Sequence, residues 1–282
     1  MLRVATRGSA LARWQAERVV ALLGNPAHEL VIITTVGDVR TDVPIHALGG
    51  QGVFVKEVQQ AVIENHADIA VHSAKDLPAV TPTELVLGAI PERADPRDAL
   101  VGCRFAELKA GARIGTGAVR RRAQLAALRP DLAFGELRGN VDTRIEKAAQ
   151  FDAVVIAAAA LHRLGRLDVI AETLAIDVML PQVGQGALAV ECRSDDHATL
   201  ALLATIDNQR LHREVSTERA FLAVLGGGCD LPVGAYAQTG PDDELELRVF
   251  LETAEGARSA EVRGTDPERL GITAASALGV SS

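Results

Sequence analysis

The sequence predicts an α/β fold of two similar lobes around a cleft, followed by a small C-terminal α+β domain. Short runs of β-branched and aliphatic residues alternate with helical patterns over most of the chain, which is typical of α/β proteins. Two stretches open alike, "VATRGSALARWQA" and "IGTGAVRRRAQLA", each with a strand, a glycine-containing turn and a helix. The last part of the chain instead reads as consecutive strands closed by a helix. These patterns indicate two related lobes and a separate smaller domain.

The first series of elements predicts the first lobe. A strand "LRVAT" precedes a helix over 9–23, and "ELVIITTV" precedes a helix over 53–65. In the second helix, Phe54, Val58 and Val62 recur at the spacing of one apolar face, so this helix is expected to lie on a sheet. The strands "DIAVHS" and "LVLGAI" complete the lobe.

A turn-rich segment over 90–100 separates this lobe from the second series. The second series consists of "ARIGTG", a helix over 119–128, "AFGELR", a helix over 141–149 and "DAVVIAAAA". We expect these elements to repeat the arrangement of the first lobe.

The C-terminal part predicts a long helix from about 211 to 225, the strands "LPVGAYAQ", "ELELRVFLET" and "ARSAEVRG", and a final helix. The predicted domains are therefore 1–91 together with 187–204, then 97–181, and then 209–282.

Composition argues against several classes of partner. The net charge is −8 and aromatic residues make up only 3% of the 282 residues, so neither a basic face nor base-stacking platforms are expected, and nucleic acid is excluded as a partner. The longest apolar run, 153–161, is too short to span a bilayer, and the N-terminus shows no signal-peptide pattern. We expect a cytoplasmic protein with no membrane partner.

The three cysteines, at 103, 192 and 229, are widely spaced and form no CxxC pair. Neither a disulfide framework nor a metal site is therefore expected.

Arginine dominates the basic residues, with 25 arginines and four lysines. Several arginines follow predicted strands, where ligands of open α/β sheets bind: Arg7, Arg120, Arg121 and Arg138, with Arg144 in the first turns of the next helix. A guanidinium donates two parallel hydrogen bonds to a carboxylate, so these positions favour a cleft for a ligand with several negative groups. The alternative is an ordinary charged surface. "GTGAVRRR" lacks the pattern of a nucleotide loop, and its three successive arginines cannot all face one ligand, so one is expected to face solvent.

The stretch "DIAVHSAKDLP" leads an apolar strand directly into Lys75 and Asp76. These two residues could form a plain surface pair. In a cleft crowded with guanidinium groups, Asp76 would instead be the carboxylate that stabilises a developing cation or moves a proton.

Cys229 directly follows Gly226, Gly227 and Gly228. It could be a small apolar residue in a tight turn. Alternatively, it could be a nucleophile that carries a covalently bound group, since glycines let a bulky group approach the backbone. The spacing leaves both interpretations open.

Taken together, the motifs resemble those of the porphobilinogen deaminases, also called hydroxymethylbilane synthases. The similarity runs in order along the whole chain through "LRVATRGSALARWQA", "GGQGVFVKE", "DIAVHSAKDLP", "ERADPRDA", "GTGAVRRRAQL", "LRGNVDTR", "ALHRLG", "LPQVGQGALAVECR" and "GGGCDLPVGAYA". The resemblance implies a dipyrromethane cofactor bound by a thioether to Cys229. It also implies that four porphobilinogen molecules are joined head to tail with loss of ammonia, and that linear hydroxymethylbilane is released by hydrolysis.

The resemblance also implies roles for individual residues. Asp76 takes the position of the catalytic aspartate. The implied cofactor-binding residues are Cys229, Lys75, Asp76, Ser73, Thr116, Arg120, Arg121, Arg138, Arg144, Asp38 and Gln185. The implied substrate-binding residues are Arg3, Arg7, Ser9, Gln15, Phe54, Arg144 and Arg163. No metal is implied. Because every pyrrole ring of such a ligand carries two carboxylates, the resemblance also accounts for the excess of arginine.

The chain departs from the common family pattern at Gln51, Gly117, Ala118 and Asp230. Gln51 replaces a lysine in the glycine-rich loop, two hydroxyl groups are absent at 117 and 118, and an acidic residue follows Cys229. Two alternatives to a working enzyme therefore stay open: a family member with impaired turnover, and a two-lobed carboxylate-binding protein similar to periplasmic binding proteins. The chain is expected to be a monomer.

Overall fold

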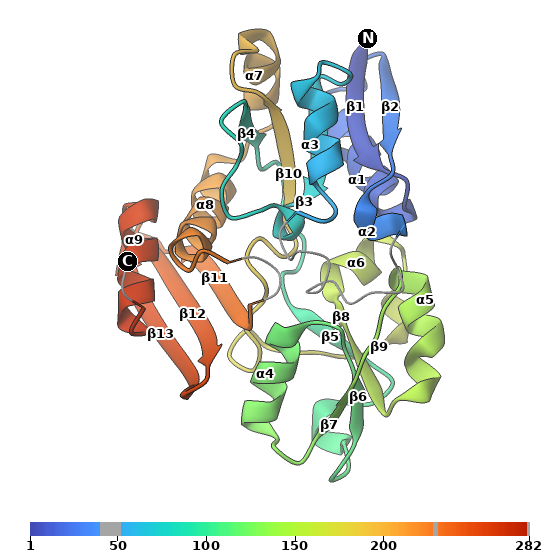
Figure 1. Cartoon of the computed structure of the whole chain (residues 1–282), viewed down its shortest axis with the longest axis vertical. Coiled ribbons are helices and arrows are strands. Elements are labelled where there is room, and N and C mark those ends of the chain that lie inside the picture. The colour runs from blue at the N-terminus through green and yellow to red at the C-terminus, as the bar shows by residue number, and fades with distance from the viewer. Residues whose placement is uncertain (40–51, 228–230, 281–282) are drawn as a thin grey trace.

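The computed structural model describes residues 1–39, 52–227 and 231–280, arranged around two five-stranded sheets and one three-stranded sheet. In Figure 1 the first sheet lies above the second, and the C-terminal sheet lies at the left of both. The α/β class and the two-lobed arrangement with a small C-terminal α+β unit are confirmed by this architecture. The exact domain limits that the sequence predicts are not tested by it and stay a prediction.

The first sheet has the strand order β2-β1-β3-β10-β4. Its strands are β1 (Leu2–Arg7), β2 (His28–Ile33), β3 (Ile69–Ser73), β4 (Leu85–Ala89) and β10 (Leu188–Arg193). The helices of this lobe are α1 (Ala10–Leu22), α2 (Val36–Val39), α3 (Lys56–Ile63) and α7 (His197–Ala204). Neighbouring residues of β1 enter different cores: Val4 packs with α1 and α7, whereas Ala5 packs with α3. The sheet is thus covered on both faces, as parallel sheets require.

The second sheet repeats this topology, with the order β7-β6-β8-β5-β9. Its strands are β5 (Asp98–Val101), β6 (Arg113–Gly115), β7 (Ala133–Gly135), β8 (Ala153–Ala157) and β9 (Ile170–Thr173). Its helices are α4 (Val119–Leu128), α5 (Val141–Glu146) and α6 (Ala158–Arg163). In both sheets three parallel strands come first and one antiparallel strand, β10 or β5, follows at the fourth place. The similar openings of the two series therefore do correspond to similar lobes.

Two sequence predictions in the second lobe were wrong in detail. The run "DAVVIAAAA" changes from strand β8 to helix α6 at Ala158, because its β-branched residues favour a strand whereas the alanines that follow favour a helix. The segment over 90–100 is not all turn, since Asp98 already begins β5. Short apolar runs do not distinguish strand from helix by periodicity alone.

Two crossing segments connect the lobes, one near 90–97 and one near 182–187. They run antiparallel beside each other: Ala94 N donates to Gly186 O at 3.0 Å, and Leu188 N donates to Glu92 O at 3.0 Å. A bridge between Arg93 and Ala187 adds to this pairing. Paired backbone of this kind fixes the two connections relative to each other.

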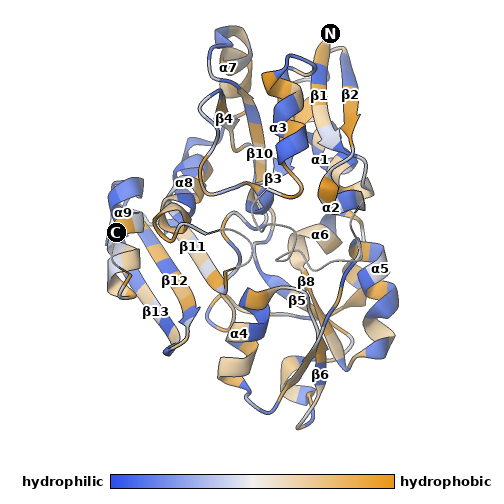
Figure 2. Ribbon diagram, viewed as in Figure 1, coloured by the Kyte–Doolittle hydropathy of each residue, from blue (hydrophilic) through white to orange (hydrophobic). Residues whose placement is uncertain are grey.

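The C-terminal unit consists of β11 (Val233–Thr239), β12 (Leu245–Thr253), β13 (Gly256–Gly264), α8 (Gln209–Val224) and α9 (Pro267–Ala277). Hydrophilic and hydrophobic residues alternate along β12 and β13 in Figure 2, because one face of the sheet meets the helices and the other is largely exposed. Phe250 is the exception on the outer face, since it packs with Ala123 and Leu180 of the second lobe. The side chains of Phe221, Leu247 and Ala274 belong to its core.

Glu218 of α8 anchors this unit to the crossing segments. Its carboxylate is fully buried and accepts hydrogen bonds from Arg93 Nη1 at 2.7 Å and Gly184 N at 2.7 Å. It also accepts a hydrogen bond from Ala237 N of β11 at 2.9 Å. One side chain therefore joins both connections to the third sheet.

Among the described helices, none combines the length and apolarity that a membrane crossing requires.

The contact between α8 and α9 gives a stability prediction. A Cβ atom at Gly271 would lie 2.6 Å from Phe221 N, so Gly271→Ala forces the helices apart. Overpacking of this kind costs about 1–3 kcal/mol, which exceeds the gain of about 1 kcal/mol from replacing a helical glycine. We expect a lower midpoint of thermal unfolding for Gly271→Ala, and no significant change for Ser276→Ala on the exposed face of the same helix. A Gly271→Ala variant as stable as the parent chain would contradict the packing argument.

Candidate active site

A cavity of about 500 Å³ lies between the two lobes. Its walls come from the carboxyl ends of β1, β2 and β3 in the first lobe, and from α4, α6 and the segment that follows β7 in the second. Nine of the predicted site residues line it: Arg7, Ser9, Asp38, Phe54, Lys75, Asp76, Arg121, Arg138 and Arg144. They meet here because the carboxyl ends of parallel strands share one edge of a sheet, and the two edges face each other.

The lining of the cavity is rich in cations. Arg7, Lys75, Arg121, Arg138 and Arg144 supply positive charge, and the acidic residues among the lining residues are Asp38, Asp76 and Asp142. Asp142 pairs with the half-exposed Arg166 at 2.9 Å. A surface of this kind suits a ligand that carries several carboxylates.

Lys75 and Asp76 belong to a single 3-10 turn, Ala74–Asp76, at the end of β3. The second crossing segment holds this turn: Ala74 N donates to Ala187 O at 3.0 Å, and Gln182 Nε2 donates to Lys75 O at 3.3 Å. Gly184 has φ of +70°, and a Cβ there would lie 3.1 Å from Lys75 N. A glycine is therefore needed where this segment passes the turn.

Two cations of the cavity have lowered pKa values. Burial lowers the pKa of Lys75 to about 8, although the nearby carboxylate of Asp76 opposes the change. Burial likewise lowers the pKa of Arg144 to about 10, and the charge of Arg121 adds to the effect. An incoming carboxylate would reverse both shifts, so its binding to these side chains is favoured.

Arg7 lies between an acidic and an aromatic neighbour. Its guanidinium carbon is 4.1 Å from the centre of the Phe54 ring, and its Nη2 pairs with Asp38 Oδ1. Burial alone would raise the pKa of Asp38, but hydrogen bonds from Arg7 and Thr35 hold it below its usual value. The Phe54 ring also fills the space beside Gly37, where an added Cβ would clash with the ring. Arg7 is thus held at the wall of the cavity.

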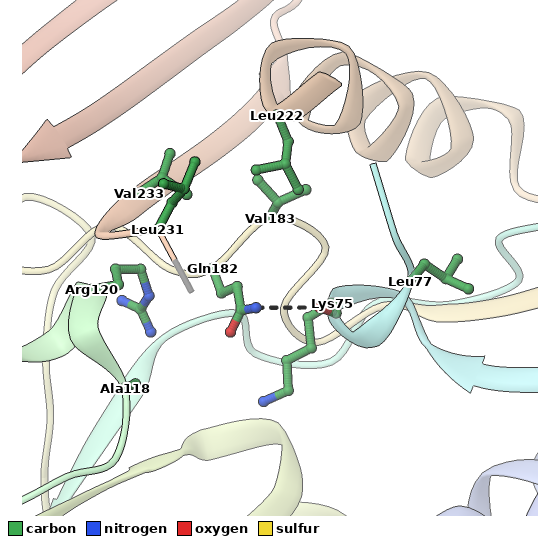
Figure 3. Close-up of a pocket in the computed structure, with 9 residues that line it drawn as sticks. All are labelled: Lys75, Leu77, Ala118, Arg120, Gln182, Val183, Leu222, Leu231 and Val233. Atoms are coloured by element: carbon green, nitrogen blue, oxygen red, sulfur yellow. Dashed lines mark hydrogen bonds between the residues drawn. The ribbon is translucent and has the colours of Figure 1, made fainter. Parts of the chain in front are cut away.

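A second, much smaller cavity of about 20 Å³ adjoins Lys75. In Figure 3, side chains from several parts of the chain converge on it: Lys75, Arg120 of α4, Gln182, Leu222 of α8 and Leu231. Arg120 Nη1 donates to Leu180 O at 2.6 Å, whereas its Nε, which is buried, has no hydrogen-bond partner among the described residues. Arg120 therefore serves this smaller space and does not line the large cavity.

The predicted cofactor cysteine, Cys229, lies outside the described residues, as do Asp230 and Gln51. Leu231, two positions beyond Cys229, lines the small cavity.

Four predicted residues lie behind the cavity walls. Gln15 Nε2 donates to Ser73 Oγ at 2.7 Å, which joins α1 to the end of β3. The hydroxyl of Thr116 accepts from Ala118 N at 3.2 Å, and Gln185 Nε2 donates to Pro96 O at 2.7 Å. These four side chains do not line the large cavity, and their hydrogen bonds hold the segments that do.

Two predicted arginines are placed elsewhere. Arg3 stands near the amino end of β1, the opposite end from Arg7, and pairs with Asp68 at 2.6 Å. Arg163 of α6 donates to Gly186 O at 2.7 Å and lies 5.6 Å from the ring of Trp14 in α1. Arg163 therefore joins the lobes near the second crossing segment, and neither arginine lines the cavity.

The three successive arginines separate as expected. Arg120 and Arg121 are buried, and Arg122 is partly exposed and pairs with Glu136 at 2.7 Å. Sequence reasoning missed Asp98, the buried partner of the first two. The signal was present, since Asp98 stands in the quoted stretch "ERADPRDA", but only the fold brings it beside α4.

The structure shows what the loss of hydroxyl groups at Gly117 and Ala118 changes in the turn before α4. A Cβ at Gly117 would lie 2.9 Å from Leu137 O, so the turn before α4 packs more closely than a serine would permit. Ala118 occupies the N-cap of α4 and provides no side-chain cap. The start of this helix therefore keeps backbone N–H groups that a carboxylate can accept from.

Among the described residues there is no group of histidine, cysteine and acidic side chains that could hold a metal ion.

The family model for "Porphobilinogen deaminase, dipyromethane cofactor binding domain" matches residues 2–201.

The chain belongs to the porphobilinogen deaminase family.

A second model of this family, "Porphobilinogen deaminase, C-terminal domain", matches residues 212–279. The chain is 44% identical to the porphobilinogen deaminase of Brevibacillus brevis, over 98% of this chain and 93% of the relative. It is 47% identical to that of Roseiflexus, over 98% and 95%. It is 44% identical to that of Bacillus subtilis, over 96% and 90%.

Among solved structures, the chain is similar to the Bordetella pertussis BvgS periplasmic VFT2 domain. That likeness has 15% identity and a TM-score of 0.43, and covers 73% of this chain and 86% of that one. It is too weak to add to the fold described above.

The site fits the dipyrromethane cofactor of this family. The large cavity offers cations from both lobes, and Arg120 Nε stands buried without a partner among the described residues beside the small cavity. A ligand with two rings and four carboxylates matches this distribution of donors.

The lowered pKa of Lys75 makes stability depend on pH. Below about pH 8 the ammonium is charged in both the folded and the unfolded chain, and its burial destabilises the fold. Between about pH 8 and 10.5 the folded chain has released a proton that the unfolded chain still binds, so the contribution of Lys75 to stability rises with pH across this window.

We therefore expect Lys75→Met to stabilise the cofactor-free chain more at pH 7 than at pH 10. Denaturant titrations at both pH values measure the difference, with intact mass confirming that no ligand is bound. Lys109→Met, at an exposed lysine, is the control and should show the same small effect at both. An equal effect of Lys75→Met at the two pH values would contradict the assigned burial.

Proposed function

We propose that this chain is a working hydroxymethylbilane synthase, a transferase that joins four porphobilinogen molecules head to tail with release of ammonia. The linear product is released by hydrolysis. One observation carries the proposal: a single cavity gathers Asp76 with guanidinium groups from both lobes. Family membership supplies the reaction, and the cavity offers the charges that its substrate and product require.

The dipyrromethane, held by a thioether to Cys229, would supply the primer to which the first substrate unit is joined. Lys75, Arg121, Arg138 and Arg144 would hold its carboxylates in the large cavity. Arg120 would take a carboxylate at the small cavity, where its Nε has no partner among the described residues. Ser73, Thr116, Asp38 and Gln185 would support these side chains from behind or beside them.

Asp76 would be the catalytic residue. Departure of the amine leaves positive charge on the substrate, and a carboxylate held among cations is the group that stabilises such charge and exchanges a proton with it. The turn that carries Asp76 is fixed by the second crossing segment, so its carboxylate needs little reorganisation.

Arg7, Ser9 and Phe54 would bind the incoming porphobilinogen. Ser9 caps α1 and lines the cavity, and Arg7 stacks on the Phe54 ring beside it. Asp38 holds Arg7 at the cavity wall, so a substrate carboxylate would share this guanidinium with it. Gln15 would act through Ser73. Arg3 and Arg163 do not line the cavity and have protein partners, so their substrate contacts stay a prediction.

We further propose that the chain works as a cytoplasmic monomer. Both lobes of this chain contribute cations to the cavity, which supports a site that a single chain can build. Size-exclusion chromatography tests the oligomeric state.

Asp76→Asn tests the catalytic role. The amide keeps the size of the side chain but loses the charge and the proton-transfer capacity, so we expect turnover to fall by about 10²–10⁴-fold with an unchanged unfolding midpoint. Turnover is measured as hydroxymethylbilane formed from porphobilinogen. Asp131→Asn, at a surface ion pair remote from the cavity, is the control. Parent-like turnover of Asp76→Asn would remove Asp76 from the mechanism.

Cys229→Ser tests the covalent attachment. The parent chain should carry extra mass equal to one dipyrromethane, and the serine variant should show only the polypeptide mass, because a hydroxyl is a far weaker nucleophile than a thiol. Cys103→Ser, at a half-buried surface thiol, should keep the extra mass. Extra mass on Cys229→Ser would place the attachment elsewhere.

The same preparation separates the remaining alternatives. Incubation with porphobilinogen should yield product and ammonia. Bound cofactor without turnover would indicate an impaired family member, and neither cofactor nor turnover would indicate a carboxylate-binding protein.

A further inference from the structure

Asp98 is a buried carboxylate to which the reaction assigns no role. It is the first residue of β5, directly after the first crossing segment, and its relative exposure is 0%. Both oxygens are used: Oδ2 accepts from Arg120 Nη2 at 2.7 Å, and Oδ1 accepts from Arg121 Nη2 at 2.7 Å. Burial alone would raise the pKa of Asp98, but the charges of the two arginines hold it far below its usual value. Asp98 is therefore an anion throughout the pH range of a living cell.

The contact with Arg121 has a definite orientation. Nε and Nη2 of Arg121 both donate to Asp98 Oδ1, at 3.1 and 2.7 Å, so the carboxylate meets the side edge of the guanidinium. Nη1 donates to Val155 O at 2.9 Å. A guanidinium has five N–H groups, so one N–H on each Nη has no described partner. Since Arg121 lines the large cavity, these two N–H groups are the ones available to a ligand carboxylate.

The Asp98 carboxylate binds two arginines that line different cavities. Arg120 is drawn to Oδ2 and to Leu180 O, and serves the small cavity, whereas Arg121 serves the large one. Two buried guanidinium groups that bind the same carboxylate also repel each other. A single negative charge between them offsets this repulsion.

Asp98 is also tied to the connection between the lobes. Gln185 Nε2, from the second crossing segment, donates to Asp98 Oδ1 at 3.0 Å and to Pro96 O at 2.7 Å. The position of the Arg121 guanidinium is thus set relative to the crossing segments as well as to its own helix.

We propose that Asp98 is a positioning residue of the active site, which orients Arg121 so that its end-on N–H pair faces the cavity and keeps Arg120 directed to the small cavity. Asp98 touches neither substrate nor cofactor and acts through the two guanidinium groups. The inference rests on the proposed function, because the ligand carboxylates are those of the dipyrromethane and of the growing chain.

Asp98→Asn is the first test. The amide keeps the size of the side chain but removes the charge and turns N–H groups toward the arginines. We expect at least a threefold lower fraction of cofactor-bearing chains, by intact mass after exposure to porphobilinogen. In the chains that bear the cofactor we expect a KM at least tenfold higher, with kcat changed less than threefold. Asp98→Glu, which restores the charge, should lie closer to the parent chain in both measurements.

A double-mutant cycle shows whether Asp98 acts through Arg121. Arg121→Lys keeps the charge, but an ammonium cannot meet Asp98 side-on and a ligand end-on at once, so we expect a similar rise in KM. In Asp98→Asn combined with Arg121→Lys, the fold-changes should be far smaller than the product of the single effects. Arg122→Ala, at the partly exposed neighbour, is the control and should stay within twofold of the parent chain.

Three outcomes would overturn the proposal: Asp98→Asn with parent-like cofactor content and KM, single effects that multiply in the double variant, or an Asp98→Glu variant no better than Asp98→Asn. If Asp98→Asn does not fold, as judged by its unfolding midpoint, Arg121→Lys decides alone, and parent-like loading and KM in that variant would overturn the proposal. A parent chain that gains no cofactor mass and forms no product would instead refute the proposed function.

Discussion

The mutual repulsion of buried guanidinium groups is the constraint around which this site is organised. A ligand with many carboxylates requires many cationic side chains around one cavity. These side chains repel one another and destabilise the folded chain when no ligand is bound. The structure meets this conflict with carboxylates placed behind the cavity or at its wall: Asp98 serves Arg120 and Arg121, and Asp38 serves Arg7. Arg144 is different, since it is given a carbonyl partner, Gly139 O, and its pKa is lowered. An incoming anion would therefore stabilise the charged forms of Lys75 and Arg144.

The two crossing segments fix the positions of the charged side chains around the cavity. One of them holds the turn that carries Lys75 and Asp76, and the same pair of segments is bound by Glu218 of the C-terminal unit. Gln185 connects them to Asp98 and therefore to the arginines of the second lobe. These contacts are buried or partly buried. Buried polar groups are costly unless they are satisfied, so the segments have few alternative arrangements. The crossing segments therefore hold both the turn that carries Asp76, in the first lobe, and Asp98, which binds the arginines of the second lobe.

Much of the architecture could be predicted from local pattern. The helix over 119–128 was placed without error, because its apolar positions follow helical spacing, and the two lobes were paired through their similar openings. The change from strand to helix at Ala158 was missed because the run is apolar throughout and a short apolar run does not distinguish the two by periodicity, although its alanines favour a helix. Arg7, Arg121 and Arg138 were predicted from their position after strands, where open sheets bind ligands, and all three line the cavity. Arg120 was predicted on the same basis but lines the small cavity instead. Their roles toward substrate and cofactor stay predictions.

The sequence by itself determined the class of fold, the family and the concentration of arginine at strand ends, because these depend on periodicity and on motifs that are local in the chain. The tertiary structure alone decided which arginine faces which space. Arg120 and Arg121 are neighbours in sequence, yet a carboxylate 22 and 23 positions away directs one to the small cavity and the other to the large one. Arg3 and Arg7 share a strand, yet only the residue at its carboxyl end reaches the site. The direction of a long charged side chain depends on partners that are distant in sequence, and only the folded chain brings those partners near.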